Sequence, residues 1–161
     1  MTALRIAWFK VYQPLAYYAA YFTVYAGGAF NATVILNGLA SQKQELARIA
    51  ALKHLTAVDK DNATMIEVAA EMYLRGMEFL PISLEKSEAT AFKIEDGKLL
   101  PPFNCIPALG NAAAGEIVKV RNEHLFTSKA DLKKRGKVSQ SIIDTMAVSY
   151  THLTLPTSDL V

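Results

Sequence analysis

Cysteine and histidine are scarce in this chain, and their scarcity limits the chemistry that it can carry. Among 161 residues there is one cysteine, Cys105, so no disulfide can form within the chain, as in proteins of a reducing compartment such as the cytoplasm. Cys105 lies in an apolar stretch, where we expect a small buried thiol. The three histidines are scattered and have no spacing typical of a metal site. We therefore expect no catalytic residues, no bound metal and no cofactor in this chain.

Charged residues are absent from residues 11–30, and twenty such residues could span a bilayer. Pro14 interrupts this stretch, and it holds five tyrosines, which belong at the edge of a membrane rather than at its centre. We also expect no signal peptide, because no small-residue cleavage site ends a compact apolar run. The sequence favours two buried helices that meet near Pro14. A membrane-associated helical scaffold using residues 11–30 is the alternative.

Net charge is also small, at +2, while hydrophobic residues make up 52% of the chain, enough for a core. The length suits one domain or pieces of two. Apolar periodicity predicts helices over residues 2–12 and 14–25, a helical stretch over 29–55 broken at Gly38, and a helix restarting at 59–62 and ending at Gly76. Residues 78–84 and 90–95 look like strands, with a hairpin turn at 95–98.

The expected fold is mainly α with a small β hairpin. A helical body would occupy residues 1–76, a small β element 77–102, and tandem helix-hairpin-helix motifs 103–147, with 148–161 as a non-native tail. The first two helices are rich in aromatic residues whose covering surface would lie elsewhere. We expect an exposed aromatic patch there, formed by Trp8, Phe9, Tyr17, Tyr18, Tyr21 and Phe22.

Residues 104–121 carry the strongest functional signal. An apolar, proline-containing turn leads to Gly110, and an alanine-rich helix follows with basic residues toward its end. Gly110 would let the bend approach a phosphate, and Asn111 is a favoured N-cap. The unpaired N–H groups of the first helical turn would then face an anion, with Ala112 and Ala113 leaving room. An ordinary turn between packed helices is the alternative.

A second copy of this pattern follows. Residues 128–135 have a capping serine, an early acidic residue and late basic residues, after which Gly136 and Lys137 turn and Ser139 caps another helix. Residues 119–137 contain seven basic and two acidic side chains, a net charge of +5, whereas residues 1–118 have ten basic and eleven acidic ones, a net charge of −1. Such an asymmetry is typical of proteins that bind a nucleic-acid backbone, although a solvated charged face could also produce it.

The predicted contacts read phosphate rather than bases, so binding should not depend on sequence. The residues that we expect at the DNA backbone are Ala108, Leu109, Gly110, Asn111, Ala112, Ala113, Lys119, Arg121, Lys133, Lys134, Arg135, Gly136, Lys137 and Ser139.

The last fourteen residues lack both helical and strand periodicity. Back-translated, residues 148–157 fit the transposase-end adapter of sequencing libraries, so we expect the natural chain to have been cut near Ala147.

Three long segments, residues 5–24, 71–110 and 126–144, resemble in their order the C-terminal part of PolC-type DNA polymerase III, a family of replicative polymerases. The resemblance implies that residues 5–24 end the fingers region and that the remainder binds duplex DNA through tandem hairpins. Ala108 stands where the family usually has a glycine, and Tyr25 and Gly27–Gly28 stand in a more charged stretch of the family.

The same resemblance implies that the catalytic aspartates, which hold two Mg²⁺ ions, lie upstream, and that a sliding-clamp-binding peptide would follow Ala147. The chain would then be a cytoplasmic fragment that binds primer–template DNA and the rest of the polymerase chain, with no membrane partner and no catalysis of its own. A stand-alone helix-hairpin-helix protein of repair or DNA uptake is the main alternative.

Overall fold

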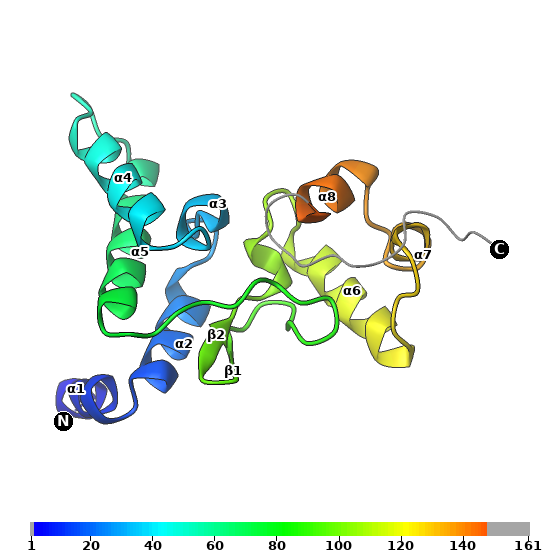
Figure 1. Ribbon diagram of the computed structural model, residues 1–161, viewed down its shortest axis with the longest axis horizontal. Helices are drawn as coiled ribbons and strands as arrows, with labels where there is room; N and C mark the ends of the chain where they lie inside the picture. Colours follow the sequence, from blue (N-terminus) through cyan, green and yellow to red (C-terminus); the bar gives the residue numbers. More distant parts are fainter. Residues whose placement is uncertain (1, 148–161) are drawn as a thin grey trace.

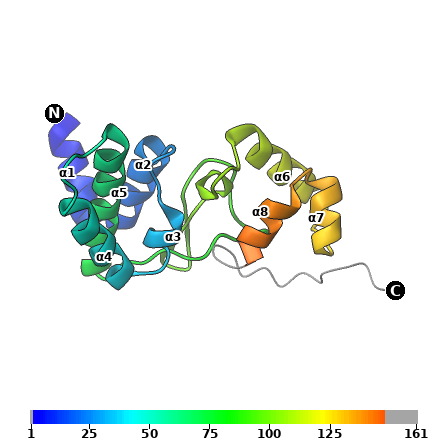
Figure 2. The same cartoon turned by 90° about the horizontal axis from the view of Figure 1, so that it is seen from above.

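The computed structural model describes residues 2–147, which form two groups of helices on either side of a short β hairpin (Figure 1). The expected class, mainly α with a small β hairpin, is confirmed. The first group contains α1 (Thr2–Tyr12), α2 (Pro14–Tyr25), α3 (Ala32–Ile35), α4 (Leu39–Ala50) and α5 (Ala57–Leu74). Strands β1 (Lys93–Glu95) and β2 (Lys98–Leu100) follow, and then the 3₁₀ turn η1 (Phe103–Cys105), α6 (Asn111–Glu123), α7 (Lys129–Arg135) and α8 (Gln140–Thr145). Seen from above, α1–α5 and α6–α8 remain two separate lobes (Figure 2).

The helix boundaries follow local sequence signals. Pro14 is the first residue of α2, where its missing N–H costs nothing. Gly38, with φ +94°, separates α3 from α4, and Gly76, with φ +85°, follows the end of α5. The expected restart at 59–62 is wrong by a few residues. Helix α5 begins at Ala57 because Thr56 and Asp59 form a reciprocal capping box.

An aromatic cluster joins the helical body to the β element. Phe22 of α2 lies 5.3 Å from Phe79 and 5.5 Å from Phe92, measured between ring centroids, and Phe30 lies 5.2 Å from Phe92. All four side chains are buried. The segment that follows β2 joins the same core through Phe103, Ile106 and Leu109, so it is packed against the helical body.

The β element is smaller than the sequence predicts. Strands β1 and β2 pair in antiparallel register, with Ile94 opposite Leu99, as the turn at 95–98 requires. The predicted strand at 78–84 is wrong: Phe79 and Ile82 form isolated bridges, the first with Leu99, and no continuous ladder forms across Pro81, which has no N–H to donate.

Helix α1 carries the exposed aromatic surface. None of its side chains is buried, and Trp8 and Tyr12 keep 49% and 68% of their surface exposed. The expected patch is wrong for Tyr18 and Phe22, which are completely buried because α2 packs against the core. Of the helices described in residues 2–147, none combines the length and the apolar character that crossing a bilayer requires.

A polar cluster fixes α1 and α2 on α5. The Tyr18 hydroxyl donates to Glu71 Oε1 over 2.6 Å, and Lys10 Nζ lies 2.7 Å from the same oxygen. Arg75 donates to the Tyr18 hydroxyl and to the Lys10 carbonyl. Glu71 is therefore the centre of an interhelical network.

Candidate nucleic-acid interface

The first hairpin connects η1 to α6 and turns its bend toward solvent. Ile106 donates its N–H to the Phe103 carbonyl over 3.0 Å, and Leu109 donates to the Ile106 carbonyl over 3.1 Å. Leu109 is buried and anchors the bend, whereas Ala108 and Gly110 are exposed. The backbone at Ala108 and Gly110 is therefore accessible from solvent.

The position that needs a left-handed backbone is Ala108, with φ +67°, and not Gly110, whose φ is −75°. The expected role of Gly110, to leave room for a phosphate, does not depend on a left-handed backbone. The backbone at Gly110 is open to solvent on the side where a Cβ would point, because a Cβ added there would meet no atom within 4 Å.

Helix α6 begins with free amides. Its N-cap is Gly110, so the expected capping role of Asn111 is wrong: Asn111 is the first helical residue, and its Oδ1 accepts a hydrogen bond from Asn104 Nδ2. Among the described residues, no side chain caps this helix end. The N–H groups of residues 111–113 precede the first helical bond, from Ala114 to Gly110, so they can bind an anion.

The second hairpin connects α7 to α8. Ser128 accepts a hydrogen bond from the Asp131 N–H and Ser139 accepts one from the Ile142 N–H, as their predicted capping roles require. The left-handed residue is Lys137, with φ +54°. Gly136 is buried, and a Cβ on it would lie 2.7 Å from the Leu132 carbonyl oxygen, so this bend needs glycine for packing.

Exposed lysines lie on α6, on α7 and in the second bend. Lys119, Lys133 and Lys134 are exposed, and none of them makes an ion pair within residues 2–147. Lys137 is 76% exposed, and its Nζ lies 3.8 Å from Glu116 on the second turn of α6. This contact joins the second bend to α6 at a residue about 8 Å along the helix axis from Asn111.

Residues 76–149 match the family model of the helix-hairpin-helix motif. The chain is 44% identical to DNA polymerase III PolC-type from Thermotoga maritima over 144 residues, 89% of this chain and 10% of the relative. It is 46% identical to the protein of the same name from Bacillus subtilis over 146 residues, again 89% of this chain and 10% of the relative. The relative from Clostridium perfringens is 43% identical over 147 residues, 91% of this chain and 10% of its own length.

The chain is homologous to PolC-type DNA polymerase III. It spans about one tenth of the length of the curated relatives that it matches. The resemblance inferred from residues 5–24, 71–110 and 126–144 is thus confirmed. The suggested adapter origin of residues 148–161 concerns residues outside those that the structure describes.

Two of the basic residues expected at DNA have structural roles in this chain. Arg121 is only 7% exposed, and its Nη1 donates to the Ser87 carbonyl over 2.5 Å and to the Leu84 carbonyl over 3.4 Å. Burial lowers the pKa of its guanidinium, which Glu88 partly offsets. The assignment of Arg121 to the DNA backbone is wrong, because its donors face the protein interior.

Arg135 is also held by the protein. Its Nη1 lies 2.9 Å from Asp131 Oδ2, its Nη2 donates to the His124 carbonyl over 2.9 Å, and its guanidinium lies 5.2 Å from the Phe126 ring centroid. Burial by itself would raise the pKa of Asp131, but the Thr127 N–H and Arg135 outweigh it and keep that pKa below its ordinary value. Arg135 therefore ties α7 to the end of α6 and is not free to neutralise a phosphate.

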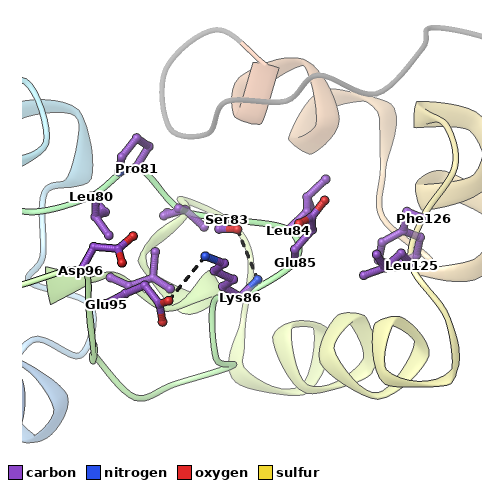
Figure 3. A pocket seen from close by; sticks show the side chains of 12 residues that line it. Leu80, Pro81, Ser83, Leu84, Glu85, Lys86, Glu95, Asp96, Leu125 and Phe126 are labelled. Atoms are coloured by element: carbon purple, nitrogen blue, oxygen red, sulfur yellow. Dashed lines mark hydrogen bonds and ion pairs between the residues drawn. The ribbon is translucent and has the colours of Figure 1, made fainter. Parts of the chain in front are cut away.

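A separate concavity of about 360 Å³ lies between the 80–86 segment and the β turn, near Leu125 and Phe126 (Figure 3). Lys86 Nζ lies 3.4 Å from Glu95 Oε1 there, and Glu85 and Asp96 add two more carboxylates to the lining. This surplus of negative charge makes it unsuitable for phosphate. Among the described residues, no three of His, Cys, Asp and Glu gather in a way that could hold a metal ion.

Proposed function

We propose that this chain binds the sugar–phosphate backbone of primer–template duplex DNA as part of a PolC-type replicative polymerase. The observation that carries the proposal is the first bend, where the uncapped amides of residues 111–113 open to solvent inside a matched helix-hairpin-helix motif. Amides at a helix N-terminus favour anions, and the small alanine side chains beside them leave a strand free to approach.

The contact would involve residues 106–113 of the first hairpin and 136–139 of the second. At the second bend the exposed residues are Lys137 and Ser139. Gly136 is buried and lets the bend pack closely against Leu132. Lys119, Lys133 and Lys134 would neutralise neighbouring phosphates, since none of them has an acidic partner in the described part of the chain. Such contacts read no base, so affinity should depend on salt and not on sequence.

Nucleotidyl transfer would belong to the parent polymerase and not to this chain alone. The family resemblance implies that the aspartates that hold Mg²⁺ lie in a part of the polymerase outside these residues. Under this proposal residues 1–76 support the fingers, 77–102 link them to the hairpins, and 103–147 hold the duplex, all in the cytoplasm. The rest of the polymerase chain would cover the apolar face of α1.

The test is a fluorescence anisotropy titration of the full chain against two labelled primer–template duplexes of unrelated sequence, at several salt concentrations. The double variant Lys133→Ala/Lys134→Ala removes two unpaired charges from α7. We expect equal affinity for the two duplexes and a salt dependence whose slope falls by roughly 2 in the variant, about 0.9 per lost phosphate contact.

Lys43→Ala/Lys53→Ala is the matched control, because it removes two exposed lysines from the helical body. It should leave the slope nearly unchanged. A duplex affinity that is the same in both double variants and in the parent would refute the proposal, as would a strong preference for one sequence.

A further inference from the structure

A groove of about 820 Å³ runs alongside the first hairpin. One wall is formed by residues 104–111, and the opposite wall by the loop between α2 and α3, which contains Gly27 and Gly28. In the ribbon, α3 and this hairpin face each other across the middle of the molecule (Figure 1). The volume lies within the range of roughly 300–1,000 Å³ typical of ligand sites in proteins.

The lining of this groove contains no charged side chain. Its side-chain amides and threonine hydroxyls are neutral, and its floor is the aromatic cluster of Phe22, Phe30 and Phe92. The amides and hydroxyls come from Thr23, Asn31, Asn62, Thr90, Asn104 and Asn111. A phosphate here would meet no carboxylate, in contrast to the concavity near Glu95. The side chains of the groove therefore neither repel nor attract a polyanion through net charge.

The groove is continuous with the uncapped end of α6. Gly110 and Asn111, which begin that helix end, also line the groove, so a strand bound at one would run directly into the other. At the far wall, added Cβ atoms on Gly27 and Gly28 would meet nothing within 4 Å, and the backbone there is open to close approach.

We propose that this groove holds the continuation of the DNA strand whose phosphate binds the first turn of α6, so that the sugar–phosphate chain passes from the first hairpin to the Gly27–Gly28 loop. This inference rests on the proposed duplex binding. It adds the α2–α3 loop of the helical body to the proposed DNA interface, so that both lobes would contact the same DNA strand. Because the floor rings are buried, the strand would contact the walls and rim and would not stack its bases.

Gly28 offers a direct test, because its φ is not in the left-handed region and its Cβ position is empty. Gly28→Glu would place a negative charge in the path of the strand, and Gly28→Lys a positive one. In low salt we expect the Glu variant to bind duplex at least five-fold more weakly than the parent, and the Lys variant several-fold more tightly. The affinities are measured by anisotropy, with circular dichroism to confirm the fold.

The matched control is the pair Ala47→Glu and Ala47→Lys on the exposed face of α4, which changes the net charge equally at a distance from the groove. If the Gly28 pair differs no more than the Ala47 pair, while the parent chain binds duplex, the groove assignment is wrong and the hairpin assignment stands. If the parent chain shows no duplex binding at all, the proposed function itself fails. Should the Glu variant not fold, the gain of affinity in the Lys variant remains the deciding measurement.

Discussion

Ala108 occupies a backbone conformation that ordinarily belongs to glycine, and Ala108→Gly should therefore stabilise the protein. Its φ is +67°, in the left-handed region, where a Cβ costs roughly 1–2 kcal/mol. Glycine would remove that strain but would add roughly 0.4–1 kcal/mol of unfolded-state entropy to be lost on folding. The methyl group is exposed, so its removal forfeits little burial.

The balance is a gain of about 0.5–1 kcal/mol in the free energy of unfolding. For a chain of this length that corresponds to a rise in Tm of about 1–4 °C, measurable by calorimetry or by circular dichroism at 222 nm. The φ/ψ values of the bend should not change, so duplex affinity should stay within about two-fold.

Ala113→Gly is the matched control, because Ala113 is also exposed but lies in the first turn of α6 with helical geometry. The same chemical change there should cost roughly 0.5–1 kcal/mol. If both variants lower Tm by similar amounts, Ala108 does not experience left-handed strain, and the assignment of the bend to this residue is incorrect.

Three other predictions concern charged side chains. Arg121→Met leaves the buried Ser87 carbonyl and the part-buried Leu84 carbonyl without their donor and should lower the free energy of unfolding by about 2–3 kcal/mol in urea titrations. An unchanged urea midpoint would show that those bonds contribute nothing. Glu116→Gln removes the acidic neighbour of Lys137 and should raise duplex affinity several-fold at low salt with little change in stability, whereas a loss of affinity would place Glu116 on the DNA-binding side. The hydrogen bond from Lys10, followed by that from the Tyr18 hydroxyl, holds the pKa of Glu71 below its ordinary value. The ionised carboxylate therefore stabilises the fold above about pH 4.3, and this stabilisation is lost as the pH falls through the folded pKa. Glu71→Gln should flatten the acid side of a plot of urea midpoint against pH, and an unaltered plot would contradict this.

The parts of the fold that were predictable are those encoded over a few residues. Ser128 and Ser139 cap helices through bonds to residues three positions ahead, and Pro14 and Gly76 mark helix ends by their own backbone limits. The β turn at 95–98 is equally local. Such signals need no knowledge of the tertiary structure.

The roles of Arg121 and Arg135 could not be predicted in this way. Arg121 bonds the carbonyl of Ser87, 34 residues earlier, and Arg135 bonds carbonyls 10 to 15 residues earlier, so basic character alone cannot separate a structural arginine from a phosphate-binding one. Lys119, Lys133, Lys134 and Lys137 of the same stretch remain exposed, in keeping with the strong hydration of an ammonium group. The strand predicted at 78–84 is a different case: β2 is there as a partner, since its Leu99 exchanges backbone bonds with Glu78 and Leu80, but Pro81 prevents a continuous ladder.

Helix α1 contributes no buried side chain and is attached mainly by its packing on α2 and by the bonds that Lys10 makes with Glu71 and Arg75. A segment held by so little buried surface opens at low free-energy cost while the core remains folded. Its amide protons should accordingly exchange with deuterium long before those of α5, whose inner face is fully packed. Limited proteolysis would cut the isolated chain first within its initial three helical turns, and docking onto a larger body would slow both reactions.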